Sequence, residues 1–175
     1  MRWILALALL CALAPKPSLA EETVSNVAVV EGSVDAVWKL LTTQAGLESW
    51  VVPHANVDLR TGGFLRTNHM ANGKIGDENT VTSQILDVKS KKKLSIKLVE
   101  APKTIPMAAS MVGTWYEITL SSLPKKQTRV QCVGHGFAEG PMGYMGRTIA
   151  GQGSAWALQQ LQKYCLMLKT SKSGK

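Results

Sequence analysis

Short runs in which apolar and polar residues alternate fill the middle of the chain. Alternation with a period of two is typical of β-strands that bury one face, and clusters of Gly, Pro, Asn or Lys between such runs are typical of hairpin turns. The runs that predict strands are residues 23–31, 55–60, 64–70, 80–88, 93–99, 114–120 and 128–137. This order predicts an antiparallel meander.

The pattern changes to helical spacing near both ends of the meander. Ser33 is a suitable N-cap for a short helix up to Leu41, and a second short helix is expected over residues 45–50. One long amphipathic helix is expected over residues 154–169. Its most consistent apolar stripe consists of Ala157, Leu161, Cys165 and Leu168, flanked by Trp156 and Tyr164.

A twisted antiparallel sheet has one apolar face to cover, and one long helix can cover it. We therefore expect an α+β fold in which a curved seven-stranded antiparallel sheet wraps around a long C-terminal helix, with two short helices after the first strand. Such a sheet tends to leave space between itself and the helix. The architecture thus favours binding of an apolar ligand.

This order of elements resembles the START-like, or helix-grip (SRPBCC), superfamily, and most closely its polyketide cyclase/dehydrase and lipid-transport family with the heat-shock-activator-like relatives. The resemblance covers residues 27–168, and its most specific piece is Asp58-Leu59-Arg60-Thr61-Gly62-Gly63-Phe64. The other stretches that carry it are residues 27–31, 34–41 with Trp38, 46–50, 86–88, 93–96, 128–130 and the last helix. The resemblance implies a helix-grip fold whose ligand enters at the end of the sheet opposite the basic turns.

Residues 1–20 have the features of a secretory signal peptide. Arg2 precedes an apolar run that is shorter than the roughly 20 residues needed to span a bilayer, and Ser18-Leu19-Ala20 offers small residues for cleavage. We expect a periplasmic or extracellular protein with a START-like domain over residues 21–169 and a disordered basic tail over residues 170–175. Cleavage removes Arg2 and Lys16 and lowers the formal net charge from +8 to +6.

The two ends of the predicted meander differ in chemistry, because alternate turns lie at the same end. One end collects Arg60, Lys89, Lys91, Lys92, Lys93, Lys125 and Lys126. The other collects Met107, Met111, Met142 and Met145, and methionine adapts to irregular apolar shapes. We expect the methionine-rich end to be the mouth of a cavity, although these residues would also serve to cap the sheet. The candidate ligand contacts, for which core packing is the alternative, are Trp50, Phe64, Trp115, Tyr116, Phe137, Met142, Met145 and Trp156.

The sequence contains no recognised catalytic motif, and no cofactor is expected. His54, His69 and His135 are too widely spaced to predict a metal site. Cys132 and Cys165 are both expected to face the core, close enough to form a disulfide if oxidised, with two unpaired thiols as the alternative. Glu117 would enter the cavity only if the other face of its strand pointed inward.

These observations predict an exported, monomeric binding protein for a hydrophobic or amphipathic small molecule, lipid-like or polyketide-like, rather than an enzyme. The alternatives are a cyclase- or dehydratase-like enzyme that uses the same cavity and a protein-interaction module. The basic turns favour contact with anionic lipid head groups or envelope polymers. Nucleic acid is not expected as a partner, because aromatic residues are not interleaved with the lysines.

Overall fold

The computed structural model of the chain describes residues 22–105 and 107–173, so the predicted signal peptide lies outside the described residues. In chain order the elements are β1 (Val24–Glu31), α1 (Val34–Thr42), α2 (Gln44–Trp50), β2 (His54–Val57), β3 (Phe64–Asn68), β4 (Thr80–Lys89), β5 (Lys93–Glu100), the 3₁₀ turn η1 (Ala108–Met111), β6 (Trp115–Leu123), the 3₁₀ turn η2 (Pro124–Lys126), β7 (Gln127–His135) and α3 (Gly140–Ser173).

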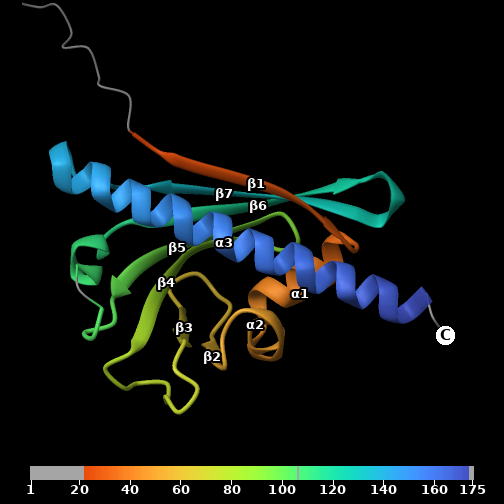
Figure 1. Cartoon of the computed structure of the whole chain (residues 1–175), viewed down its shortest axis with the longest axis horizontal. Helices are drawn as coiled ribbons and strands as arrows, with labels where there is room; N and C mark the ends of the chain where they lie inside the picture. The colour runs from red at the N-terminus through yellow and green to blue at the C-terminus, as the bar shows by residue number, and fades with distance from the viewer. Residues whose placement is uncertain (1–21, 106, 174–175) are drawn as a thin grey trace, which may run out of the picture.

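The seven strands form one antiparallel sheet in the order β1-β7-β6-β5-β4-β3-β2, which confirms the predicted α+β fold. The sheet curls so that α1, α2 and α3 lie on its concave side (Figure 1). Register shifts in the β4–β5 pair fall between Thr82 and Ser83 and between Ile85 and Asp87. Such bulges bend a strand and increase its twist, which accounts for part of the curl.

The Asp58–Phe64 segment is a turn rather than the end of a strand. The second predicted strand, residues 55–60, is wrong at its far end, since β2 stops at Val57. The Asp58 amide then donates to the Phe64 carbonyl at 2.9 Å, and the Ile85 amide donates to the Gly63 carbonyl at 2.8 Å. A Cβ atom at Gly63 would lie 2.2 Å from the Asp58 carbonyl oxygen, so only glycine fits there.

Helix α3 is longer than the sequence predicted at both ends. It begins at Gly140 instead of Ser154 and continues to Ser173, so residues 170–173 are helical rather than part of a disordered tail. Its four early interior glycines, Gly143, Gly146, Gly151 and Gly153, oppose helix formation locally. Tertiary contacts offset this cost, among them hydrogen bonds from the Asn26 amide to the Gly151 carbonyl at 3.1 Å and to the Ser154 hydroxyl at 2.8 Å.

α3 runs along β1 in the same direction, as Figure 1 shows. Polar contacts mark this alignment from one end of β1 to the other: Arg147 pairs with Glu22, the Gln162 side chain donates to the Val29 carbonyl at 3.0 Å, and Lys169 pairs with Glu31 at 2.9 Å. The Gln127 amide and the Lys169 ammonium both lower the pKa of Glu31. The helix is therefore fixed along the β1 edge of the sheet.

Two hydrophobic clusters form the core. The larger one joins the concave face of the sheet to α1 and to the C-terminal half of α3, where Leu158, Leu161 and Cys165 are buried. The smaller one packs α2 against β2 and β3 through Leu47, Val52, Ala55 and Leu65. The predicted stripe of α3 is thus confirmed at Leu161 and Cys165, while Ala157 and Leu168 are half-buried.

Candidate functional site

The large core cluster fills only part of the concave face. On β5, β6 and β7 its members or close neighbours include Leu94, Ile96, Ile118, Leu120 and Cys132. Further along the same face, toward the loops before β6 and after β7, Leu98, Tyr116 and Val81 are only half-buried and lie outside that cluster. These three side chains of the concave face therefore lie outside the continuous core.

Glycines and aromatic side chains meet in this second part of the concave face. A Cβ atom at Gly134 would lie 3.0 Å from Tyr116 Cε1 and 3.2 Å from Phe137 Cζ. A Cβ atom at Gly146 on α3 would lie 3.3 Å from Met111 Sδ and 3.6 Å from Phe137 Cδ1. Tyr116, Phe137 and Met111 thus occupy the space between the sheet and the helix where both glycines lack side chains. Burial raises the pKa of Tyr116.

The remaining predicted ligand residues are distributed over three other places. Trp50 packs against the core and donates its indole N–H to the Leu40 carbonyl at 3.1 Å. Phe64 lies under the Arg66 guanidinium at 4.8 Å, and Trp115 stacks on His135 with ring centroids 3.9 Å apart. Because side chains alternate along a strand and Tyr116 faces α3, Trp115 faces the convex side.

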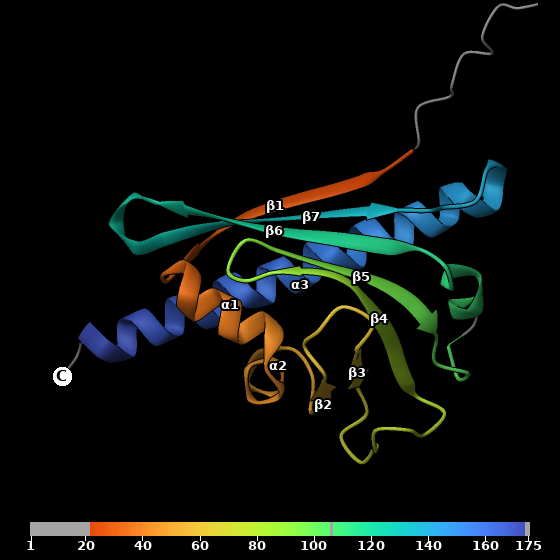
Figure 2. The same ribbon diagram turned by 180° about the vertical axis from the view of Figure 1, so that it is seen from behind.

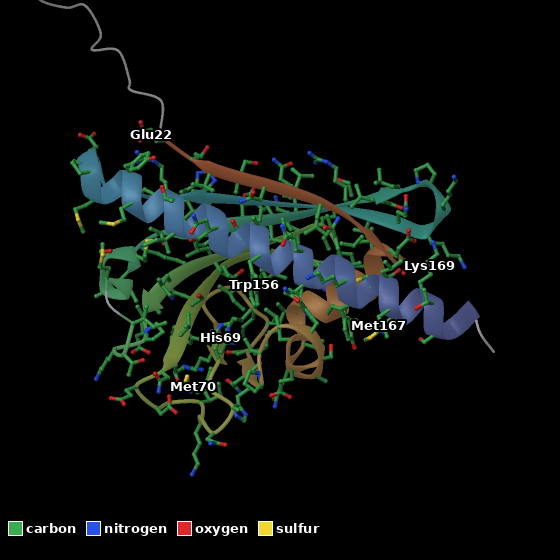
Figure 3. All side chains as sticks on the ribbon, viewed as in Figure 1. Glu22, His69, Met70, Trp156, Met167 and Lys169 are labelled. Carbon is green, nitrogen blue, oxygen red and sulfur yellow. The ribbon has the colours of Figure 1, made fainter. Side chains whose placement is uncertain are left out.

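Met142, Met145 and Trp156 lie on α3 itself, where their side chains are exposed. The sequence analysis placed Met142 and Met145 before the helix, at the mouth of a cavity. In the structure both residues belong to α3. Figure 3 shows Trp156 near the middle of α3. The structure therefore brings together Tyr116 and Phe137 among the predicted contacts, and adds Met111 and Gly146.

Two loops meet at the methionine-rich end, as the meander rule predicted. The Lys103 amide donates to the Glu78 carbonyl at 2.8 Å, and Thr104 is hydrogen-bonded to Asn79. Asp77 organises the first loop by accepting hydrogen bonds from Asn68 at 2.7 Å and from the Lys74 amide at 2.9 Å. The hydrogen bond from Lys74 is the main reason why the pKa of Asp77 is lowered.

A polar pocket of about 460 Å³ lies beside these loops. Its lining residues from the strands include Arg66, Thr82 and Glu100, which are register partners on the convex face. The other lining residues are Gly76, Asp77, Glu78, Thr80, Ala101, Lys103, Ala109 and Val112. Thr82 is only 3% exposed, and its hydroxyl has no hydrogen-bond partner among the described residues. Sequence reasoning missed this pocket, which lies on the opposite side of the sheet from α3.

Several residues of the predicted basic end are engaged in ion pairs. Lys93 lies 3.1 Å from both Asp87 and Glu117, and Lys91 pairs with Asp35. These carboxylates raise the pKa of Lys93, the hydrogen bond with Asp87 contributing most. Glu117 therefore lies on the convex face with Lys93, and the alternative in which it enters the cavity is wrong.

The described residues contain no cluster of three or more His, Cys, Asp or Glu side chains that could hold a metal ion. His54 contacts the Ala71 carbonyl oxygen at 3.1 Å, His69 follows β3, and His135 stacks on Trp115. Cys132 and Cys165 are free thiols in the same core region, and burial raises the pKa of each to about 11. Within residues 22–105 and 107–173, no helix is long and apolar enough to cross a membrane.

Comparison with solved structures finds the same fold at low identity. The Aha1 dimer from Colwellia psychrerythraea matches with a TM-score of 0.62 and 16% identity over 82% of this chain and 96% of that chain. A protein from Mesorhizobium loti matches with a TM-score of 0.64 and 18% identity over 82% and 96%. DynU16, from the dynemicin biosynthetic locus, matches with a TM-score of 0.61 and 16% identity over 82% of this chain and 47% of its own.

No curated protein matched the chain. The family model described as "Activator of Hsp90 ATPase homolog 1-like protein" matches residues 31–165, which is well over half of the sequence. Both comparisons agree with the resemblance drawn from the sequence. The chain belongs to the family of Activator of Hsp90 ATPase homolog 1-like proteins, within the SRPBCC helix-grip superfamily.

Proposed function

We propose that this protein binds a hydrophobic or amphipathic small molecule between the concave face of the sheet and the N-terminal half of α3. The observation that carries the proposal is the arrangement around Gly134 and Gly146. There, Tyr116, Phe137 and Met111 lie between the sheet and the helix, next to positions that have no side chain. Entry of a ligand would require these three side chains to rotate aside, whereas the region of Leu158, Leu161 and Cys165 is buried in the continuous core.

The expected affinity follows from the area of such a site. A ligand that buries about 300 Å² of apolar surface gains roughly 7 kcal/mol. Association and ordering of side chains offset part of this gain. Binding in the micromolar range or weaker is therefore expected, which suits a carrier that must also release its ligand.

Two further points support a small-molecule ligand. DynU16, which shares the fold, is a protein in the dynemicin biosynthetic locus. The sequence also contains none of the recognised catalytic motifs. We therefore place binding ahead of a cyclase- or dehydratase-like reaction.

We also propose that the protein is exported and acts in a periplasmic or extracellular compartment, as residues 1–20 predict. N-terminal sequencing of the protein purified from its native host should begin at Glu21. An intact Met1 would contradict export by cleavage.

The ligand proposal is tested with N-phenyl-1-naphthylamine, an apolar probe whose fluorescence rises on leaving water. Gly146→Leu fills the space beside Met111 and Phe137 and should weaken probe binding at least fivefold. Gly153→Leu is the matched control, because it makes the same change in helix propensity on the same helix while its Cβ meets no atom within 4 Å. Native mass spectrometry of the purified protein should additionally reveal a co-purified apolar molecule.

Equal probe binding by the two variants, or no binding by the wild type, would contradict the proposal. The family description names an activator of the chaperone Hsp90, so a protein-interaction module would then become the leading function. Pull-down of a protein partner from the native compartment would test that function directly.

A further inference from the structure

We infer that the polar pocket beside the loops that follow β3 and β5 binds a small aliphatic α-amino acid in its zwitterionic form. The inference goes beyond ligand binding at α3 and does not depend on it, since this pocket lies on the opposite side of the sheet. Figure 2 shows the sheet with α3 behind it, and the two loops lie at the same end of the sheet. The volume of about 460 Å³ falls within the range of roughly 300–1,000 Å³ that is usual for small-molecule sites.

Three neighbouring strands contribute a row of polar side chains to the pocket. Arg66 of β3 and Glu100 of β5 are both register partners of Thr82 on β4. Because adjacent strands lie about 4.8 Å apart, the backbones that carry the cation and the anion are roughly 10 Å apart, with a hydroxyl between them. An α-amino acid carries a carboxylate and an ammonium on one carbon atom. The row therefore offers a complementary group to each of them.

Thr82 shows that this part of the sheet retains a polar group at a cost. The residue is 3% exposed, and its hydroxyl has no hydrogen-bond partner among the described residues. A buried polar group without a partner destabilises the folded protein, and a valine of the same shape would avoid that cost. Thr82 lines the pocket while its hydroxyl oxygen is covered. Rotation about its Cα–Cβ bond is therefore the movement that presents the hydroxyl to a ligand carboxylate, which accepts its hydrogen bond.

Arg66 is the group that suits the carboxylate of the ligand. Its guanidinium lies 4.8 Å from the centre of the Phe64 ring and donates to the Asn56 side chain at 3.5 Å, the limit of a hydrogen bond. Within the described part of the chain, neither Arg66 nor Glu100 forms an ion pair. A guanidinium binds a carboxylate through two parallel hydrogen bonds, so Arg66 can hold the carboxylate while Glu100 accepts from the ammonium.

The remaining charges of the lining favour a zwitterion over a simple anion. Lys103 and Glu78 add one charge of each sign to those of Arg66 and Glu100. Asp77 adds a further negative charge, although its carboxylate accepts hydrogen bonds within its own loop. The lining thus has two positive and three negative groups, and a ligand with only a negative charge would meet net repulsion.

The other border of the pocket accounts for the aliphatic side chain of the ligand. Ala101, Ala109 and Val112 contribute apolar atoms, and Val112 is 46% exposed, so a small aliphatic group would remove apolar surface from water there. The two loops are fixed to each other, because the Lys103 amide donates to the Glu78 carbonyl at 2.8 Å. A site whose borders are already fixed loses little freedom when it binds.

The test is isothermal titration calorimetry of the purified protein with L-leucine, which should bind with a dissociation constant of about 1 mM or lower. 4-Methylpentanoate lacks the ammonium and 3-methylbutylamine lacks the carboxylate, so each should bind at least fivefold more weakly than L-leucine. Changes in amide chemical shifts on addition of L-leucine should concentrate in residues 76–82 and 100–112.

Three variants test the row of side chains. Arg66→Gln should weaken the binding of L-leucine at least tenfold. Arg129→Gln is the matched control, because it makes the same change on the same face of the sheet, in β7 and outside the pocket, and it should bind as the wild type does. Thr82→Val should weaken binding at least threefold without lowering the free energy of unfolding, a combination that a purely structural hydroxyl would not produce.

No binding of L-leucine by the wild type, or an equal loss in the two arginine variants, would overturn the inference. Equal binding of 4-methylpentanoate would indicate a site for simple carboxylates and would also overturn it, as would wild-type affinity in Thr82→Val. The site at α3 is measured separately with N-phenyl-1-naphthylamine, which L-leucine should not displace. The failure of one proposal is therefore distinguishable from the failure of the other.

Discussion

Leu161→Ala is the sharpest test of how α3 is seated on the sheet. Leu161 is 0% exposed and belongs to the large core cluster together with Ile85, Leu94 and Cys165. Truncation of a fully buried leucine loses the transfer free energy of its methyl and methylene groups and leaves a cavity, at a cost of about 2–5 kcal/mol. We take about 3 kcal/mol for Leu161, because its neighbours come from several elements that cannot all collapse toward it.

Leu166→Ala provides the matched control on the same helix. Leu166 is 53% exposed, so its truncation removes little buried surface, and alanine has the better helix propensity. The expected change in the free energy of unfolding is at most about 0.5 kcal/mol. The two variants make the same chemical change and differ only in the face of α3 that they occupy.

Urea unfolding followed by circular dichroism measures the difference. With a slope of about 2 kcal/mol/M for a domain of this size, Leu161→Ala should lower the midpoint by about 1.5 M, and Leu166→Ala by less than about 0.3 M. Similar midpoints for the two variants would refute the assignment of the buried face.

Three further predictions concern other parts of the protein. Thr82→Val removes a buried hydroxyl that has no hydrogen-bond partner within the described part of the chain. It should leave the free energy of unfolding in urea unchanged or raise it by about 1 kcal/mol, and a clear loss would show that the hydroxyl is satisfied. Burial raises the pKa of the Cys165 thiol to about 11. Between about pH 9 and pH 11 the unfolded chain therefore binds fewer protons than the folded protein does. The free energy of unfolding should fall as the pH rises through that window, by on the order of 2–3 kcal/mol. Cys165→Ala should flatten this alkaline decline relative to the wild type, and an unchanged slope would contradict the assignment. Gly63→Ala should destabilise the protein by more than about 2 kcal/mol, because the new Cβ would lie 2.2 Å from the Asp58 carbonyl oxygen. Gly62→Ala should cost about 1 kcal/mol, because Gly62 has a positive φ of 80° but open space around it. Equal shifts of the melting temperature in the two variants would refute the steric argument.

The strands could be predicted because their signals are local. Alternating runs and turn residues located each strand to within a few positions. The meander rule placed residues 71–78 and 100–113 at the same end, where the Lys103 amide donates to the Glu78 carbonyl. The start of α3 could not be predicted in this way. Gly143, Gly146 and Gly151 weaken the local helical signal, and the contacts that fix this part of the helix come from β1.

The candidate site was predictable only in part, for a related reason. Alternation placed Tyr116 toward the helix, and the same rule places its neighbour Trp115 on the convex face, where it stacks on His135. Aromatic character alone therefore gave too many ligand candidates. The polar pocket depends on how residues 101–112 fold against Thr82 and Arg66, which no periodic pattern encodes.

The two halves of α3 differ in a way that connects the fold to the proposed function. The C-terminal half carries Leu158, Leu161 and Cys165 and is fixed by the continuous core. The N-terminal half carries the glycines, each of which costs about 1 kcal/mol of helix stability relative to alanine. It is held by the ion pair of Arg147 with Glu22 and by the hydrogen bond that Asn26 of β1 donates to Ser154. Tyr116 and Phe137 lie beneath this weaker half. A helix opens locally where it is least stable. A ligand that enters between the sheet and α3 would therefore need to displace only the N-terminal half of the helix. The core around the C-terminal half, which keeps the domain folded, would stay intact.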